Sequence, residues 1–105
     1  MKKLSLILFT ASLILFFVTC KKKNTTVTYT PSCSGTKSYS TQVAPLISSY
    51  CASCHSTYNT YSQAKSSASA IRNAIVNGSM PKGNTLSEDQ KNNIVCWIDA
   101  GCLNN

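Results

Sequence analysis

The sequence contains few of the residues that acid–base chemistry uses. Three acidic residues and one histidine occur among its 105 residues, and there is one methionine besides the initiator. The acidic residues Glu88, Asp89 and Asp99 all fall within one predicted helix, where the helix start and solvent exposure explain them. Because there is no second histidine and no other acidic residue, we find no general acid–base set and do not predict an enzyme.

The positive charge of the chain is concentrated near its N-terminus. Ten basic residues give a formal net charge of +7, and half of them are Lys2, Lys3 and the run Lys21 to Lys23. The rest of the chain is only weakly basic and has no basic patch interleaved with aromatic residues. We therefore predict no nucleic-acid partner and interpret the lysine run as part of a solvated spacer.

Residues 1–19 resemble the signal peptide of a bacterial lipoprotein. A short positive head precedes an apolar run over residues 4–18, which is short for a bilayer-spanning helix of roughly 20 residues. The sequence FVTC then ends in Cys20 and resembles a lipobox, although Phe17 and Thr19 depart from the commonest residues. We predict cleavage before Cys20 and a lipid on its thiol. An ordinary secretory peptide or an uncleaved anchor are the alternatives.

Residues 20–38 are predicted to form a tether followed by an irregular arm. The stretch KKKNTTVTYTPS, residues 21–32, has no apolar period, so we expect a flexible spacer. Export would place the lipid-anchored chain on the periplasmic side of the cell envelope or at its surface, where thiols are usually paired or modified. Five further cysteines then need a role: Cys33, Cys51, Cys54, Cys96 and Cys102.

Residues 39–105 are predicted to form one all-α domain of about three helices, with no convincing strand. We expect helices at about Thr41–Cys51, Tyr61–Val76 and Glu88–Ala100, with Ser66-Ser67 as a candidate break in the second. Capping boxes and stop residues mark their ends: Thr60 with Gln63, Ser87 with Gln90, Asn77-Gly78 and Gly101.

The foldable part of the chain is small and has few large apolar side chains. From Cys33 to the C-terminus it is close to roughly 70 residues, the size below which a core alone seldom gives a comfortable margin of stability. Disulfides or a cofactor usually support such domains. We therefore expect something besides side chains to fill its centre.

The stretch YCASCH places two cysteines and the one histidine within five residues. A Cys-x-x-Cys pair can hold zinc, cycle as a redox disulfide or carry a haem. Zinc sites usually take four ligands from two close pairs, and the other cysteines here are not closely paired. A thioredoxin-like site follows a strand in a βαβ unit, and no such pattern precedes Cys51. Covalent haem is therefore the favoured interpretation.

The pentapeptide from Cys51 to His55 has the spacing that covalent haem attachment requires. Each thiol of Cys-x-x-Cys-His bonds one haem vinyl group, and Cys51 and Cys54 face the same way on a helical turn, with His55 directed at the iron. An electron carrier also needs a sixth ligand, and a methionine thioether raises the reduction potential. Met80 lies before Pro81 in a turn-rich loop and is the candidate, although a gap-filling core role is the commoner one for methionine.

Three stretches, YCASCH, SMPKG and LSEDQKNNIVCWIDAG, together resemble a small monohaem class I cytochrome c of the exported lipoprotein type. The resemblance covers about residues 39–105 and implies a compact fold around a covalently bound haem c. A short segment between the histidine and the methionine, and extra cysteines on the last helix, depart from the family pattern. The implied roles are haem attachment for Cys51 and Cys54, iron ligation for His55 and Met80, and packing of the last helix across the first for Trp97.

The resemblance implies electron transfer by a membrane-tethered carrier, with redox proteins as partners and the lipid on Cys20 as anchor. The alternative is a haem-based sensor or ligand-binding module in which Met80 is displaced or unbound. The pairing of the other cysteines stays open, because one cysteine is left over in each arrangement: Cys33 with Cys96, Cys33 with Cys102 or, less easily, Cys96 with Cys102.

Overall fold

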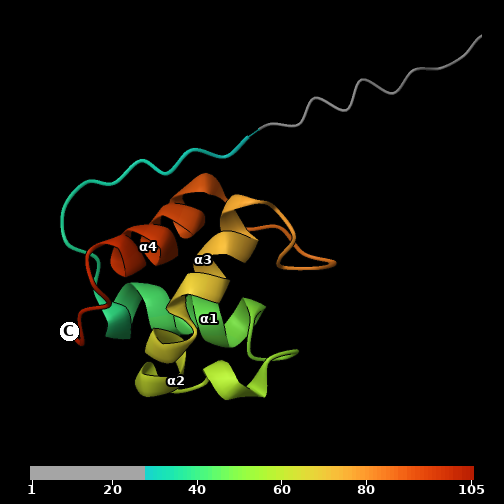
Figure 1. Ribbon diagram of the computed structural model, residues 1–105, viewed down its shortest axis with the longest axis horizontal. Coiled ribbons are helices and arrows are strands. Elements are labelled where there is room, and N and C mark those ends of the chain that lie inside the picture. Colours follow the sequence, from blue (N-terminus) through green and yellow to red (C-terminus); the bar gives the residue numbers. More distant parts are fainter. Residues whose placement is uncertain (1–27) are drawn as a thin grey trace, which may run out of the picture.

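Helices joined by loops, with no strand, make up residues 28–105, the part of the chain that the computed structural model describes (Figure 1). The predicted signal peptide, Cys20 and the lysine run lie outside these residues. The all-α class is confirmed for the described part, in which no helix reaches the length and hydrophobicity of a bilayer span. In chain order the elements are a π-helical turn η1 (Tyr39–Val43), α1 (Ala44–Tyr50), a 3₁₀ turn η2 (Ser56–Tyr58), α2 (Tyr61–Ser66), α3 (Ala68–Val76) and α4 (Glu88–Asp99).

The three predicted helices are present. The first begins earlier than predicted, and the second is interrupted. The first begins at Tyr39, two residues early, because Ser38 caps an opening π-helical turn before α1. Pro45 then occupies the first turn of α1, where its missing N–H leaves no hydrogen bond unmade. The second predicted helix is interrupted at Ser67, which separates α2 from α3 as the sequence indicated.

Local side-chain signals set the helix starts. Thr60 and Gln63 form a reciprocal capping box at α2, with both hydrogen bonds 3.2 Å long. Ser87 and Gln90 do the same at α4, with bonds of 3.2 and 2.9 Å. Both predicted capping boxes are confirmed. A capping box depends on residues only three positions apart, so the sequence alone is enough to predict it.

Trp97 joins the last helix to the first. Its side chain is 1% exposed, and its ring centroid lies 5.2 Å from that of Tyr39 in η1 and 6.4 Å from that of Tyr61. Its indole N–H donates a 2.7 Å hydrogen bond to the carbonyl of Leu103, so the buried polar atom is satisfied. The other large side chains that are buried to the same degree are Val43, Ile47, Ile94 and Val95.

Tyr29 anchors the arm before η1 to α4. The Tyr29 side chain is buried, and its hydroxyl donates a 2.6 Å hydrogen bond to Oδ1 of Asn92, which also accepts from the backbone N–H of Ser32 at 3.0 Å. The ammonium of Lys91 lies 5.1 Å from the centre of the Tyr29 ring. The expectation of a flexible spacer reaching Ser32 is therefore wrong for its last four residues, because Tyr29 finds both an apolar surface and a hydrogen-bond acceptor on α4.

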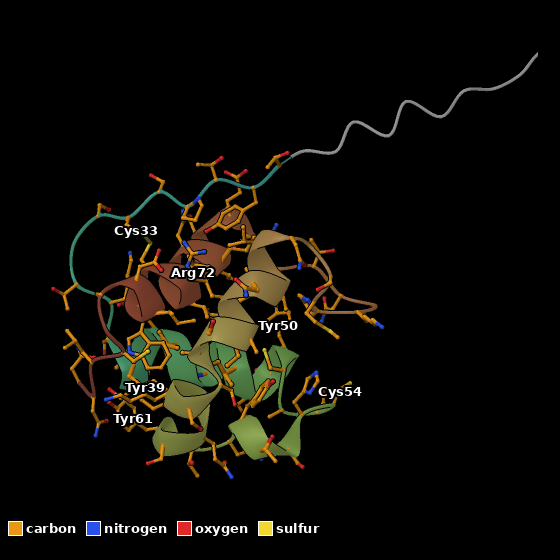
Figure 2. The ribbon with its side chains drawn as sticks, viewed as in Figure 1. Cys33, Tyr39, Tyr50, Cys54, Tyr61 and Arg72 are labelled. Carbon is orange, nitrogen blue, oxygen red and sulfur yellow. A yellow bond between two sulfur atoms is a disulfide. The ribbon has the colours of Figure 1, made fainter. Side chains whose placement is uncertain are left out.

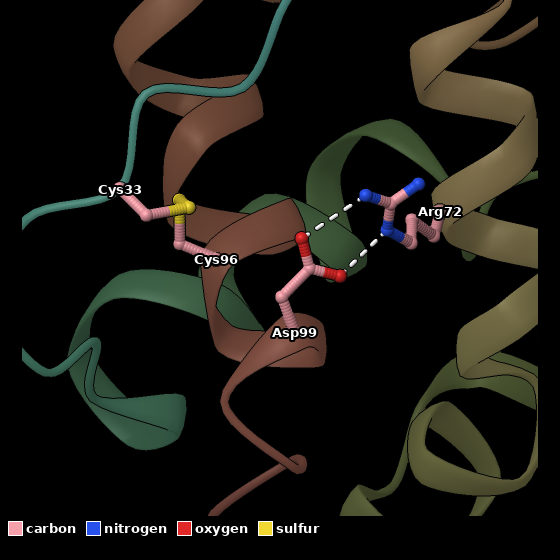
Figure 3. Close-up of polar contacts among 4 residues, drawn as sticks. All are labelled: Cys33, Arg72, Cys96 and Asp99. Carbon is pink, nitrogen blue, oxygen red and sulfur yellow. Dashed lines mark hydrogen bonds and ion pairs between the residues drawn. A yellow bond between two sulfur atoms is a disulfide. The ribbon is translucent and has the colours of Figure 1, made fainter.

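A disulfide fixes the same arm to α4. Cys33 and Cys96, 63 positions apart in the sequence, are bonded with their Cα atoms 5.4 Å apart (Figure 3). This settles the pairing that the sequence left open. Cys102 is the cysteine left over, and its side chain is buried.

An ion pair connects α3 to α4 beside this disulfide. The Arg72 guanidinium donates to both carboxylate oxygens of Asp99, at 2.6 and 3.0 Å (Figure 3). This hydrogen bonding holds the pKa of Asp99 below its usual value. Both side chains are more than a third exposed, so solvent weakens the pair.

Removing the disulfide should cost more stability than any other change to the arm. We expect the double variant Cys33→Ser/Cys96→Ser to lose about 2–4 kcal/mol of unfolding free energy, because it frees a long loop of the unfolded chain. Urea denaturation followed by far-ultraviolet circular dichroism measures this. Cys102→Ser, which leaves the disulfide intact, is the control and should lose less. A double variant as stable as the wild type would contradict the expectation.

The ion pair should make a small, pH-dependent contribution. Because the folded-state pKa of Asp99 is lowered, its stabilisation is present above the unfolded-state pKa and is lost as the pH falls through the folded-state pKa. Asp99→Asn should therefore be slightly less stable than the wild type at pH 7, and the difference should be smaller at pH 2. Urea midpoints at the two pH values test this, and an equal difference at both would exclude the ionised form of Asp99 as its cause.

Candidate functional site

A cavity of about 620 Å³ lies between the C-terminal end of α1, the turn that follows it, α3 and the loop after α3. Figure 2 shows Tyr50 and Cys54 on the side of the molecule away from Tyr39 and Tyr61. The cavity and the aromatic core, formed by Tyr39, Tyr61 and Trp97, therefore lie at opposite ends of the first helix. All four residues that the sequence predicted for one site line this cavity: Cys51, Cys54, His55 and Met80.

The cysteine motif continues the turning backbone of α1. The N–H of Cys51 still donates to Ile47, at 2.9 Å, and the N–H groups of Cys54 and His55 both donate to the carbonyl of Cys51, at 3.2 and 2.8 Å. This turn brings the two thiols to the cavity from positions three residues apart. Cys51 is half-buried, which raises the pKa of its thiol, whereas Cys54 is exposed.

His55 enters the cavity from the short turn η2. Its side chain is half-buried and lies against Tyr58, whose ring is nearly parallel to the imidazole at 17° with the centroids 5.0 Å apart. The N–H of Tyr58 donates to the carbonyl of His55 at 3.0 Å, and this bond closes the turn that places one ring over the other. Both rings line the cavity.

Met80 is held at the cavity by a loop that folds back on the end of α3. Its backbone N–H donates to the carbonyl of Ala74 at 3.2 Å, and the N–H of Gly78 donates to Ile75 at 3.2 Å. The side chain of Asn77 accepts from the N–H of Ser79 at 2.8 Å. The half-buried methionine therefore starts from a backbone position fixed to α3, and the following peptide bond to Pro81 is cis.

The wall of the cavity is aliphatic. Ile71 and Ile75 of α3 are buried and form one side, and the buried Leu86 before α4 completes it. Lys82 is the single charged residue in the lining, and it is exposed. The site thus sets sulfur and imidazole groups opposite an apolar surface, with few polar groups, as cofactor pockets of roughly 300–1,000 Å³ generally do.

Sequence reasoning missed the aromatic lining of the site. Tyr50 and Tyr58 flank the motif on its two sides, and both are half-buried against the cavity. Tyr50 adjoins the motif and Tyr58 follows His55 by three positions, which is the available signal, since short helical turns bring such residues together. The hydroxyl of Tyr50 also lies 3.5 Å from the side-chain nitrogen of Gln90, which connects the site to the start of α4.

Comparisons of the chain with family models, with curated proteins and with solved structures found no match. Within residues 28–105, no three side chains from the group of histidine, cysteine, aspartate and glutamate gather as a metal-binding cluster. The interpretation of the cavity therefore depends on its own residues, namely two thiols, one imidazole and one thioether.

The exposure of the thiols predicts their order of reaction. In the folded chain made without cofactor-attachment enzymes, iodoacetamide should alkylate the exposed Cys54 first, the half-buried Cys51 more slowly and the buried Cys102 last. Peptide mass spectrometry over time follows each cysteine separately. Cys33 and Cys96 should stay unlabelled until the disulfide is reduced. Equal rates at Cys51 and Cys54 would contradict the described burial of the motif.

Proposed function

We propose that this chain is a one-electron carrier of the class I cytochrome c type, tethered to a membrane of the cell envelope. The observation that carries the proposal is the convergence of Cys51, Cys54, His55 and Met80 on one apolar cavity, although up to 29 positions separate them in the sequence. A His–Met pair is the ligand set of an electron-carrying haem. The helical fold of residues 28–105 is compatible with a compact cytochrome c, whose finer topology belongs to the proposal.

The residues of the cavity fit a haem c. Cys51 and Cys54 would supply thiols for covalent attachment at the spacing of the motif, and the half-buried His55 and Met80 would supply an imidazole nitrogen and a thioether sulfur as iron ligands. The aliphatic wall suits the apolar face of a large flat ring. A metal already held in a macrocycle needs only axial ligands, so a cluster of three or more protein ligands is not required. A bound haem would also add apolar contacts to the small core of this short chain.

In this function the protein holds, insulates and presents the redox centre. The bound haem iron supplies a one-electron couple whose potential depends on its axial ligands. Ile71, Ile75 and Leu86 exclude water from one side of the cavity. Exposed residues such as Ser53 and Asn84 border the other side, where a partner can approach within reach of electron transfer. No proton transfer is needed, and the few acidic residues of the chain are accordingly used elsewhere.

The cellular setting of the proposal follows from the N-terminal sequence. A lipid on Cys20 would anchor the chain at the periplasmic side or the surface of a membrane, and its partners would be other redox proteins. Nucleic acid has no place in this function, since the described residues carry only five basic side chains against three acidic ones. Haem attachment outside the cytoplasm and an export signal belong together in bacteria, which supports the same setting.

The decisive measurement is the mass and absorption spectrum of the full chain made with haem-attachment machinery. We expect a mass increase of one covalently bound haem and a low-spin ferrous spectrum that carbon monoxide does not change. A high-spin spectrum that responds to carbon monoxide would favour the sensor or ligand-binding alternative. A chain without covalent haem would end both proposals.

Replacing Met80 tests the sixth ligand directly. Met80→Leu keeps the volume of the side chain but removes its sulfur, so the reduction potential should fall and the ferrous protein should bind carbon monoxide. Potentiometric titration and carbon monoxide difference spectra measure the two effects. Lys82→Ala changes an exposed residue of the same loop and should alter neither. Wild-type behaviour of Met80→Leu would show that another group is the ligand.

A further inference from the structure

The imidazole of His55 has an aromatic partner, Tyr58. The ring of Tyr58 covers one imidazole face, with the planes 17° apart and the centroids 5.0 Å apart, an offset-stacked arrangement. The contact is built into the backbone, because the N–H of Tyr58 closes η2 on the carbonyl of His55 at 3.0 Å. Residues three apart in a 3₁₀ turn lie above one another.

Stacking against the Tyr58 ring restrains the imidazole of His55. None of the side-chain hydrogen bonds within residues 28–105 involves a ring nitrogen of His55. In most metal sites a hydrogen bond from the second nitrogen orients the ligating histidine. Without that bond, rotation of the imidazole about its Cβ–Cγ bond is limited by the ring of Tyr58 that lies flat against it.

Tyr58 is itself held in place. Its side chain is half-buried and packs against the hydrophobic core, and α2 follows directly after η2. None of the side-chain hydrogen bonds in the described part of the chain involves the Tyr58 hydroxyl. The ring, and not the hydroxyl, is therefore the part of Tyr58 that acts on His55.

We infer that Tyr58 is a positioning residue, whose ring fixes the orientation of the His55 imidazole in the cavity. The inference rests on the proposed function, since it concerns the histidine that would bind the iron. Outer-shell contacts of a ligating histidine tune the metal and the strength of the bond. Removing the ring should therefore widen the range of imidazole orientations, and Tyr58→Phe should preserve it.

The first experiment detects the contact without the haem. His55 is the one histidine of the sequence, so its ring protons can be assigned without ambiguity in the nuclear magnetic resonance spectrum of the full chain in detergent. We expect upfield ring-current shifts in the wild type and in Tyr58→Phe, and their loss in Tyr58→Leu. Tyr50→Leu, which removes an aromatic ring from the same cavity but not the stacked one, should keep the shifts.

The second experiment reads the ligand in the haem-loaded full chain. The electron paramagnetic resonance g-values of a low-spin ferric haem depend on the orientation of the imidazole plane. Tyr58→Leu should broaden these signals and shift the reduction potential, and Tyr58→Phe should leave both unchanged. If circular dichroism shows that a haem-free variant is unfolded, this second experiment alone decides the inference.

The outcomes distinguish the positioning role of Tyr58 from the proposed electron-carrier function. Sharp, wild-type g-values or retained ring-current shifts in Tyr58→Leu overturn the positioning role, while the haem and the Met80 results still support the carrier. A wild-type chain without covalent haem ends the proposed function, and the haem-free spectra then decide whether the ring contact exists. Loss of the shifts in Tyr58→Leu together with rescue in Tyr58→Phe supports the inference.

Discussion

The burial of Trp97 between the first helix and the C-terminal tail is the contact on which the rest of the fold depends. An indole N–H cannot be buried cheaply without a partner, and the carbonyl of Leu103 supplies one at 2.7 Å. The tail therefore turns back on α4, and Asn105 then reaches the first helix, where its side chain accepts from the N–H of Tyr39 at 2.9 Å. One buried ring thus fixes both ends of the helical domain.

This arrangement leaves the other end of the first helix free for the cavity. Tyr39 at the start of η1 belongs to the aromatic core, whereas Cys51 after α1 belongs to the cavity. Helix α3 serves both regions, because Ile71 and Ile75 form the cavity wall while Arg72 between them binds Asp99 of α4. The position of the wall relative to the thiols is therefore set by contacts made outside the cavity.

The features that could be predicted from the sequence are those that depend on near neighbours. The capping boxes, the interruption near Ser67 and the turning backbone of the cysteine motif need only a few consecutive residues. The meeting of that motif with Met80 is predicted from the haem interpretation of the motif and from a family resemblance, and the cavity brings them together. The partner of Cys33 and the burial of Tyr29 depend on contacts about 60 residues away in sequence. Local patterns carry no information at that distance.

Given the proposed lipid on Cys20, the attachment of Tyr29 to α4 would also limit how far the domain can move from the membrane. Cys20, the proposed lipid carrier, precedes Tyr29 by nine positions, and nine residues span at most about 30 Å even when fully extended. A looser arm that began to fold only at Tyr39 would roughly double that radius. With a lipid on Cys20, the anchored arm would keep the Tyr29 end of the domain within about 30 Å of the bilayer. A redox partner of the proposed carrier would then have to bring its own redox centre into the same layer above the bilayer.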